Sequence, residues 1–216
     1  MATIMKLLLI RHGQSTGNAE GRVQGQADLP LTNLGRRQAK AGAQRLQRRE
    51  WNPTAIYCSD LVRAAETAEI LAAGWGLAVV LDERLQEYDC GELTNLNEQE
   101  IETLYPEIWH SMHHSADWGS IPGEEGNQAF DLRLQAVLAE IRARHGDEET
   151  VAIVSHGALL GTLLRQFLGL DTSRPAPFRF GNTSISVVEL LPPGPVLTLL
   201  NDTCHLDGDV QWSGHL

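Results

Sequence analysis

The stretch LLLIRHGQS, residues 7–15, joins an unbroken apolar run to a cation, an imidazole and a glycine. An apolar run that ends in a turn signal is typical of a strand buried on both faces of a parallel sheet. Open α/β sheets bind their ligands beyond the carboxyl ends of the strands. We therefore expect Arg11 and His12 in the functional site. Arginine offers a planar fork of donors for phosphate oxygens, and neutral histidine offers a nucleophilic nitrogen.

A later stretch has the same order of residue types. Residues 151–157 read VAIVSHG, which is again an apolar run followed by histidine and glycine. A serine hydrolase pair at Ser155 and His156 is an alternative interpretation. It fails because adjacent residues of a strand point to opposite faces. The chain also has no Gly-x-Ser-x-Gly nucleophile elbow.

The charge balance excludes several classes of partner. Lys and Arg number 17 against 28 Asp and Glu, for a net charge of −11 with neutral histidines. An acidic surface disfavours binding to nucleic acid or to an anionic membrane. We interpret the basic residues between positions 36 and 49 as the solvated face of a helix. The expected partner is a small phosphorylated metabolite.

The cysteines and the hydropathy of the chain indicate a cytoplasmic protein. The chain has an odd number of cysteines, and they are widely spaced, which suits reduced thiols: Cys58, Cys90 and Cys204. No Cys-x-x-Cys pair indicates zinc. The apolar run before Arg11 is too short for a signal peptide, and no run of about 18 apolar residues predicts a membrane span.

The order of the expected elements predicts the fold class. Strands are expected before Arg11 and at residues 55–59, 77–81, 151–155, 185–190 and 196–200, with helices between most of them. One helix is expected to begin after Thr32 as its N-cap. Alternating strands and helices predict an α/β three-layer sandwich with a mostly parallel central sheet. Residues 1–216 are expected to form a single domain.

Four motifs resemble those of the histidine phosphatase superfamily, which contains cofactor-dependent phosphoglycerate mutases and small phosphomonoesterases. Leu-x-x-x-Arg-His-Gly-x-Ser covers residues 7–15, and Ser-x-x-x-Arg-Ala-x-x-Thr-Ala covers residues 59–68. Leu-x-Glu-x-x-x-Gly-x-Leu covers residues 85–93, and Val-x-His-Gly covers residues 154–157. The resemblance spans nearly the whole chain and implies a phosphoglycerate mutase-like fold.

The resemblance implies a role for each motif residue in phosphoryl transfer. His12 would attack phosphorus and form a phosphohistidine, with its other ring nitrogen donating to a backbone carbonyl. Glu87 would protonate the leaving oxygen and later activate water. Arg11, Arg63 and a cationic His156 would hold the phosphoryl oxygens.

The loop after the first strand is expected to add contacts to phosphate or substrate. Asn18 matches the loop asparagine of the family, and Gln24 and Gly25 lie where the family often places further contacts. Neutral amide donors suit an anion that arginines already hold. Gly17 stands where many members have tryptophan, which removes one wall of their substrate pocket. Neither a metal nor a cofactor is expected.

The run after Glu87 favours a phosphatase. Mutases of the family have Arg-His-Tyr at this point, whereas this chain has Tyr88-Asp89-Cys90. An aspartate beside the pocket would repel the carboxylate of phosphoglycerate. We therefore predict a metal-independent phosphomonoesterase. Two alternatives stay open, a phosphoglycerate mutase that needs a diphosphorylated primer and a catalytically silent phosphate-binding module.

Residues 94–126 are expected to form a lid-like insertion. Apolar residues predict an amphipathic helix that Pro106 interrupts. Aromatic and histidine side chains between Trp109 and Trp118 would cover the phosphate pocket or form a homodimer contact. His110 and His114 have metal-ligand spacing but lack a further ligand in register. The run PGEEG at 122–126 resembles the family's Pro-x-Gly-Glu-Ser, which matches Glu125 to its glutamate without indicating a role.

Overall fold

A six-stranded sheet forms the centre of the molecule. The computed structural model describes residues 5–49, 51–114, 120–171 and 177–206. The strand order is β3-β2-β4-β1-β5-β6. The first four strands in this order are parallel, and β5 and β6 are antiparallel additions at one side. The strands are β1 (Met5–Arg11), β2 (Ala55–Cys58), β3 (Val79–Leu81), β4 (Thr150–Ser155), β5 (Ile185–Leu191) and β6 (Gly194–Asp202).

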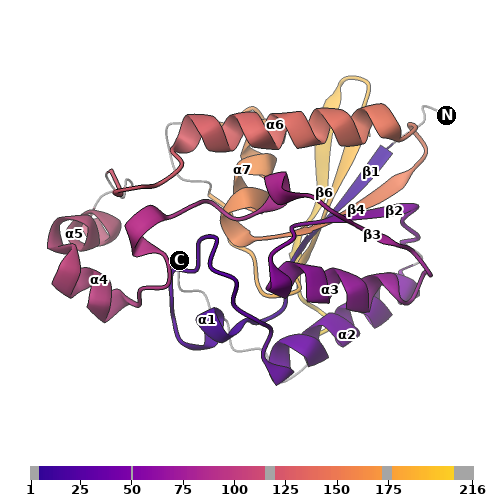
Figure 1. Cartoon of the computed structure of the whole chain (residues 1–216). Coiled ribbons are helices and arrows are strands. Elements are labelled where there is room, and N and C mark those ends of the chain that lie inside the picture. Colours follow the sequence, from indigo (N-terminus) through magenta and orange to yellow (C-terminus); the bar gives the residue numbers. More distant parts are fainter. Residues whose placement is uncertain (1–4, 50, 115–119, 172–176, 207–216) are drawn as a thin grey trace.

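Helices cover both faces of the sheet. The helices α2 (Asn33–Arg48) and α3 (Val62–Ala72) lie on one side, and α6 (Asn127–Arg144) and α7 (Gly157–Phe167) lie on the other (Figure 1). Side chains of β1 alternate between the two layers. Leu7 and Leu9 join the core cluster that includes α6 and α7, and Leu8 joins the cluster that includes α2 and α3. The predicted three-layer sandwich is confirmed.

The topology brings the two histidine motifs together. Strands β1 and β4 are parallel neighbours, and Arg11 lies opposite Ser155 in their register. His12 and His156 therefore leave adjacent strands at the same edge of the sheet. His156 is also the N-cap residue of α7. The carboxyl end of β2 leads through Ser59 to α3, so a third strand end delivers Arg63 to this edge.

The ends of two strands differ from the prediction. Strand β3 begins at Val79 instead of residue 77, because this edge strand pairs with β2 over only three residues. Strand β6 is longer than predicted because it forms an antiparallel hairpin with β5 up to Asp202. The predicted N-cap of α2 is confirmed, since the Thr32 side chain accepts a hydrogen bond from the Gly35 N–H.

The region before α6 forms a small compact unit beside the sheet. It contains α4 (Glu98–Leu104) and α5 (Pro106–His114), which lie next to each other (Figure 1). The short helix α1 (Thr16–Ala19) and the 3-10 turns η1 (Glu83–Leu85) and η2 (Gly91–Leu93) complete the elements. Pro106 separates α4 from α5 as predicted and is the first residue of α5. Leu104 is 61% exposed and is not part of a buried face. Trp118 lies outside the described residues.

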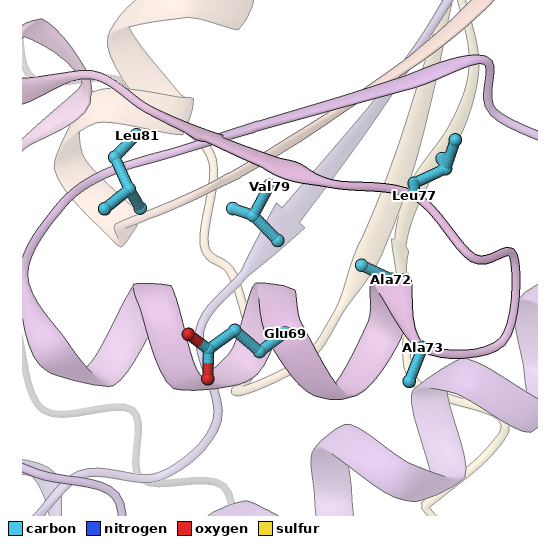
Figure 2. Close-up of a pocket in the computed structure, with 6 residues that line it drawn as sticks. All are labelled: Glu69, Ala72, Ala73, Leu77, Val79 and Leu81. Atoms are coloured by element: carbon cyan, nitrogen blue, oxygen red, sulfur yellow. The ribbon is translucent and has the colours of Figure 1, made fainter.

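A shallow hollow lies between α3 and the edge strand β3 (Figure 2). Its volume is about 330 Å³, and it is lined by Glu69, Ala72, Ala73, Leu77, Val79 and Leu81. None of these is a predicted site residue. Across the described part of the chain, no helix has both the length and the apolar character needed to cross a membrane.

Candidate active site

His12 lies buried at the carboxyl end of β1 with one ring nitrogen engaged. Its Nδ1 lies 2.7 Å from the carbonyl oxygen of Gly13. A carbonyl only accepts, so Nδ1 carries the proton and Nε2 keeps its lone pair, as predicted. The His12 carbonyl accepts hydrogen bonds from the side-chain amide of Asn182 at 3.1 Å and the Thr183 N–H at 3.2 Å. These bonds fix the backbone of the candidate nucleophile.

His156 lies beside His12 and is fully buried. The centroids of the two rings are 5.1 Å apart. The Nε2 atom of His156 lies 2.9 Å from the hydroxyl oxygen of Ser59, and its Nδ1 has no hydrogen-bond partner among the described residues. Ser59 is the first residue of the motif at residues 59–68, but its contact with His156 was not predicted. Because Nε2 of His156 faces Ser59, the other ring nitrogen, Nδ1, faces away from it.

The two arginines are anchored by backbone carbonyls. Arg11 Nη1 donates to the Phe180 carbonyl at 2.5 Å. Arg63 donates from Nη1 to the Ala27 carbonyl at 2.6 Å and from Nη2 to the Gly25 carbonyl at 2.8 Å. The Nε atoms of both arginines are buried without a partner among the described residues. Buried donors are nearly always satisfied in folded proteins, so unpartnered ones indicate a site for an acceptor such as an anion.

The Glu87 carboxyl group occupies the N-terminus of α7. Its Oε1 accepts from the backbone N–H groups of Tyr88 and Leu159 at 3.0 Å each. Its Oε2 accepts from the Ala158 N–H at 3.1 Å. Free N–H groups and the helix dipole make such an end favourable for an acidic side chain. Since His156 caps the same helix, Glu87 is held next to the two histidines.

Burial and positive charge keep both histidines neutral. Burial lowers the pKa of His12 well below its usual value, and the charges of Arg63 and Arg11 lower it further. The pKa of His156 is lowered well below the ordinary value by the same causes, burial first. Neutral His12 suits a nucleophile. The prediction of a cationic His156 is wrong for the protein by itself, although a bound phosphate dianion would favour the proton.

The arginines remain charged in this environment. Burial lowers the pKa of Arg63 to about 10, and the negative charge of Glu87 opposes that shift. The pKa of Arg11 is also lowered by burial, and Glu87 again acts in the opposite direction. Because both pKa values move under the influence of Glu87, the carboxylate and the two guanidinium groups share one electrostatic environment. Positive charge is therefore concentrated locally in a chain that is acidic as a whole.

The neutral histidines predict a loss of stability in mild acid. The unfolded chain protonates histidine near its ordinary pKa, whereas folded His12 stays neutral. The unfolded state then binds more protons, so the free energy of unfolding falls as pH falls. Between about pH 7.5 and 5.5 we expect the wild type to lose ~1 kcal/mol more than His12→Asn. Urea unfolding at both pH values measures this difference, and equal losses in the two proteins would contradict it.

The loop residues Asn18 and Gln24 meet at Ser15. The Asn18 Oδ1 atom accepts from the Ser15 N–H at 3.2 Å and from the Asn182 amide at 3.1 Å. The Gln24 Oε1 atom accepts from the Ser15 hydroxyl at 2.5 Å. Because Asn182 also binds the His12 carbonyl, Asn18 is tied to the nucleophile by one intervening side chain. The role of Asn182 is a second feature that the sequence did not reveal.

The glycines of this loop make room for, or bind, neighbouring arginine and glutamine side chains. The Gly25 carbonyl supports Arg63, and its φ of 48° lies in the region that favours glycine. A Cβ at Gly17 would lie 2.6 Å from Cγ of Gln24. Gln24 therefore fills space beside the position where many family members carry tryptophan. Among the described residues, no group of three or more His, Cys, Asp or Glu side chains could hold a metal ion.

This geometry agrees with the comparison to known proteins. The sequence pattern of the histidine phosphatase superfamily (branch 1) matches residues 7–203. The chain belongs to the histidine phosphatase superfamily. A relative from Enterobacter sp. (strain 638), named probable phosphoglycerate mutase GpmB, is 36% identical over 211 residues, which cover 94% of this chain and 96% of the relative.

Solved structures of other histidine phosphatases have the same fold. The mycobacterial glucosyl-3-phosphoglycerate phosphatase superposes with a TM-score of 0.80 at 31% identity and covers 92% of this chain and 99% of its own. The α-ribazole phosphatase from Shigella flexneri has a TM-score of 0.82 at 26% identity, with 92% and 97% covered. The expectation of a phosphoglycerate mutase-like fold is confirmed, and the chain is an enzyme of the phosphoric monoester hydrolase type.

Proposed function

We propose that this histidine phosphatase hydrolyses phosphomonoesters of small metabolites, without a metal ion, through a phosphohistidine at His12. One observation carries the proposal: the lone pair of His12 Nε2, the unpartnered nitrogens of Arg11, Arg63 and His156, and the Glu87 carboxyl group share one edge of the sheet. These are a nucleophile, three groups for the phosphoryl oxygens and one acid, which together meet the needs of phosphoryl transfer.

In the first half-reaction, His12 Nε2 attacks phosphorus while the bond from phosphorus to the alcohol oxygen breaks. Glu87 transfers a proton to that oxygen, so the alcohol leaves in its neutral form. Arg11, Arg63, His156 and the Asn18 amide NH₂ group hold the phosphoryl oxygens and stabilise charge in the transition state. The Gly13 carbonyl oxygen, which accepts a hydrogen bond from Nδ1–H of His12, stabilises the positive charge that develops on the ring.

In the second half-reaction, water attacks the phosphorus of the phosphohistidine. Glu87, now a carboxylate, accepts the proton of the attacking water. The bond between nitrogen and phosphorus breaks, inorganic phosphate leaves and His12 returns to its neutral form. The same carboxyl group therefore acts first as acid and then as base, which requires that it stay within reach of the same oxygen position.

A phosphoglycerate mutase is the second candidate, and the names of the GpmB relatives favour it specifically. It would return the phosphoryl group to a phosphoglycerate instead of passing it to water. The surroundings of Tyr88 and Asp89 support the phosphatase. The Tyr88 hydroxyl donates to Glu124 at 2.7 Å, and the Asp89 carboxylate accepts from the Gly91 N–H at 3.0 Å. A substrate carboxylate placed here would meet acidic side chains without a nearby unpaired cation among the described residues.

A silent phosphate-binding module is less consistent with the site. Binding alone needs the arginines, but it does not need a carboxyl group held beside them, since a carboxylate repels phosphate. We also infer that segment 94–126 selects the leaving group, because it follows directly on the segment that carries Glu87. The reduced thiols expected from the spacing of the cysteines support a cytoplasmic location.

The experiment that tests this function measures phosphate release from a panel of phosphomonoesters in the presence of a chelator. The panel includes 3-phosphoglycerate, with and without 2,3-bisphosphoglycerate, and the formation of 2-phosphoglycerate is followed in parallel. We expect phosphate from several esters and no isomer. Primer-dependent isomerisation would establish the mutase instead. Phosphate binding without release from any ester would favour the silent module.

A further inference from the structure

We propose that Arg133 is a positioning residue for Glu87. Arg133 acts through hydrogen bonds to the backbone of the segment that carries the Glu87 side chain. The inference rests on the proposed function, in which Glu87 is the general acid. Arg133 lies on α6, outside the cage of phosphate-binding groups, and the superfamily motifs quoted above do not include it.

The guanidinium group of Arg133 binds three backbone carbonyls in the segment that leads to Glu87. Its Nη1 donates to the Arg84 carbonyl at 2.8 Å and to the Gln86 carbonyl at 2.7 Å. Its Nη2 donates to the Glu87 carbonyl at 2.9 Å. Arg133 on α6 therefore holds both the peptide group before Glu87 and the peptide group after it.

Glu125 accepts hydrogen bonds from the remaining donors of the Arg133 guanidinium group. Its carboxylate accepts from Arg133 Nε at 2.8 Å and from Arg133 Nη2 at 2.7 Å. The same carboxylate accepts from the Asp89 N–H at 2.8 Å. All five N–H donors of the guanidinium group are then used, and its Cζ atom lies over the Phe130 ring, 4.6 Å from the ring centroid. Lysine cannot reproduce this fork, because its three N–H donors are all on one nitrogen atom.

The segment around Glu87 needs such support because no regular element holds it. Residues 87–90 belong to neither a helix nor a strand. Proton transfer requires heavy atoms about 2.6–3.2 Å apart. A displacement of about 1 Å at a catalytic group can cost roughly 10²-fold in rate. The ion pair of Arg133 and Glu125 is largely buried, with 17% and 14% of the two side chains exposed, so water competes little for its hydrogen bonds.

Two esters distinguish positioning of the acid from a general structural role. An alkyl phosphate needs a proton on its leaving oxygen, whereas a nitrophenyl phosphate releases a stable anion without one. We expect Arg133→Lys to lower kcat/KM for the alkyl ester about tenfold more than for the nitrophenyl ester. Glu125→Gln keeps the shape of its side chain and should show the same selectivity. Comparison of kcat/KM isolates the half-reaction in which Glu87 acts as acid.

The matched control is Arg84→Met. Arg84 forms ion pairs with Asp82 and Glu140 next to the same segment, but its side chain donates to no backbone carbonyl of the described residues. We expect this variant to change kcat/KM for both esters by less than about twofold. Equal losses for the two esters in the Arg133 and Glu125 variants would overturn the inference. If Arg133→Lys does not fold, Glu125→Gln decides the question by itself.

The same assay separates failure of the inference from failure of the proposed function. A wild type that releases phosphate from neither ester would contradict the proposed function, and the inference would fall with it. An active wild type whose Arg133 and Glu125 variants lose activity without regard to the leaving group would contradict the inference alone.

Discussion

His12→Ala is expected to abolish turnover, with a fall in kcat of roughly 10⁴-fold or more. The reason is the loss of the Nε2 lone pair, which is the nucleophile of the first half-reaction. The surrounding groups do not replace it. Nδ1 of His156 is neutral and buried, but Ser59 and the backbone of α7 fix that ring at a different position. Phosphate release from the panel of esters measures the effect.

Binding should survive this substitution, because the groups that hold phosphate remain. Arg11 and Arg63 keep their anchors on the Phe180, Ala27 and Gly25 carbonyls. Inorganic phosphate should therefore still raise the melting temperature of His12→Ala. The control is His145→Ala, which removes a histidine that contacts Tyr57 and Glu149, next to the amino end of β4 rather than its carboxyl end. Substantial turnover by purified His12→Ala would overturn the assignment of the nucleophile.

Glu87→Gln is expected to lower kcat/KM for alkyl phosphates by roughly 10²–10⁴-fold. An amide cannot donate the proton that the leaving alkoxide needs. It also fits the N-terminus of α7 less well. Two carboxylate oxygens accept from Ala158 and Leu159, whereas one side of an amide would point N–H groups at these donors. The loss should be smaller for a nitrophenyl ester, whose leaving group needs no proton.

Glu92→Gln is the matched control for this prediction. Glu92 lies in the same acidic segment, but it is exposed and accepts a hydrogen bond from the Tyr105 hydroxyl. Its substitution should leave the ratio of the two kcat/KM values unchanged. If Glu87→Gln loses as much activity on the nitrophenyl ester as on the alkyl ester, Glu87 is not the proton donor.

The apolar runs before His12 and His156 were sufficient to predict two strands of the sheet, β1 and β4. Each run marks a strand buried on both faces, and the parallel register then brings the two histidines together. The ends of the edge strands could not be read in this way. Strand β3 begins only where it first pairs with β2, and β6 extends as far as β5 does. Both limits depend on a neighbouring strand rather than on the local sequence.

The sequence could not predict the charge of His156 or the role of Arg133, and the physical reason is different. A motif identifies an imidazole, but its protonation depends on burial and on the distance to Arg63 and Arg11. Arg133 resembles an ordinary helical arginine next to the buried Leu134. Besides Glu125, its partners are backbone carbonyls, which leave no trace in the identity of residues 84, 86 and 87. Ser59 and Asn182 likewise act on atoms from distant segments.

The most direct test of the central claim is to trap the phosphoenzyme. Wild-type protein is mixed with a phosphomonoester, quenched in alkali during turnover and digested with trypsin. Cleavage after Arg11 releases residues 12–22, in which His12 is the one histidine. The account predicts one phosphoryl group on this peptide, placed on His12 by fragmentation and absent from His12→Ala. Steady phosphate release with no phosphoryl group on His12, or with the group on another residue, would contradict the account.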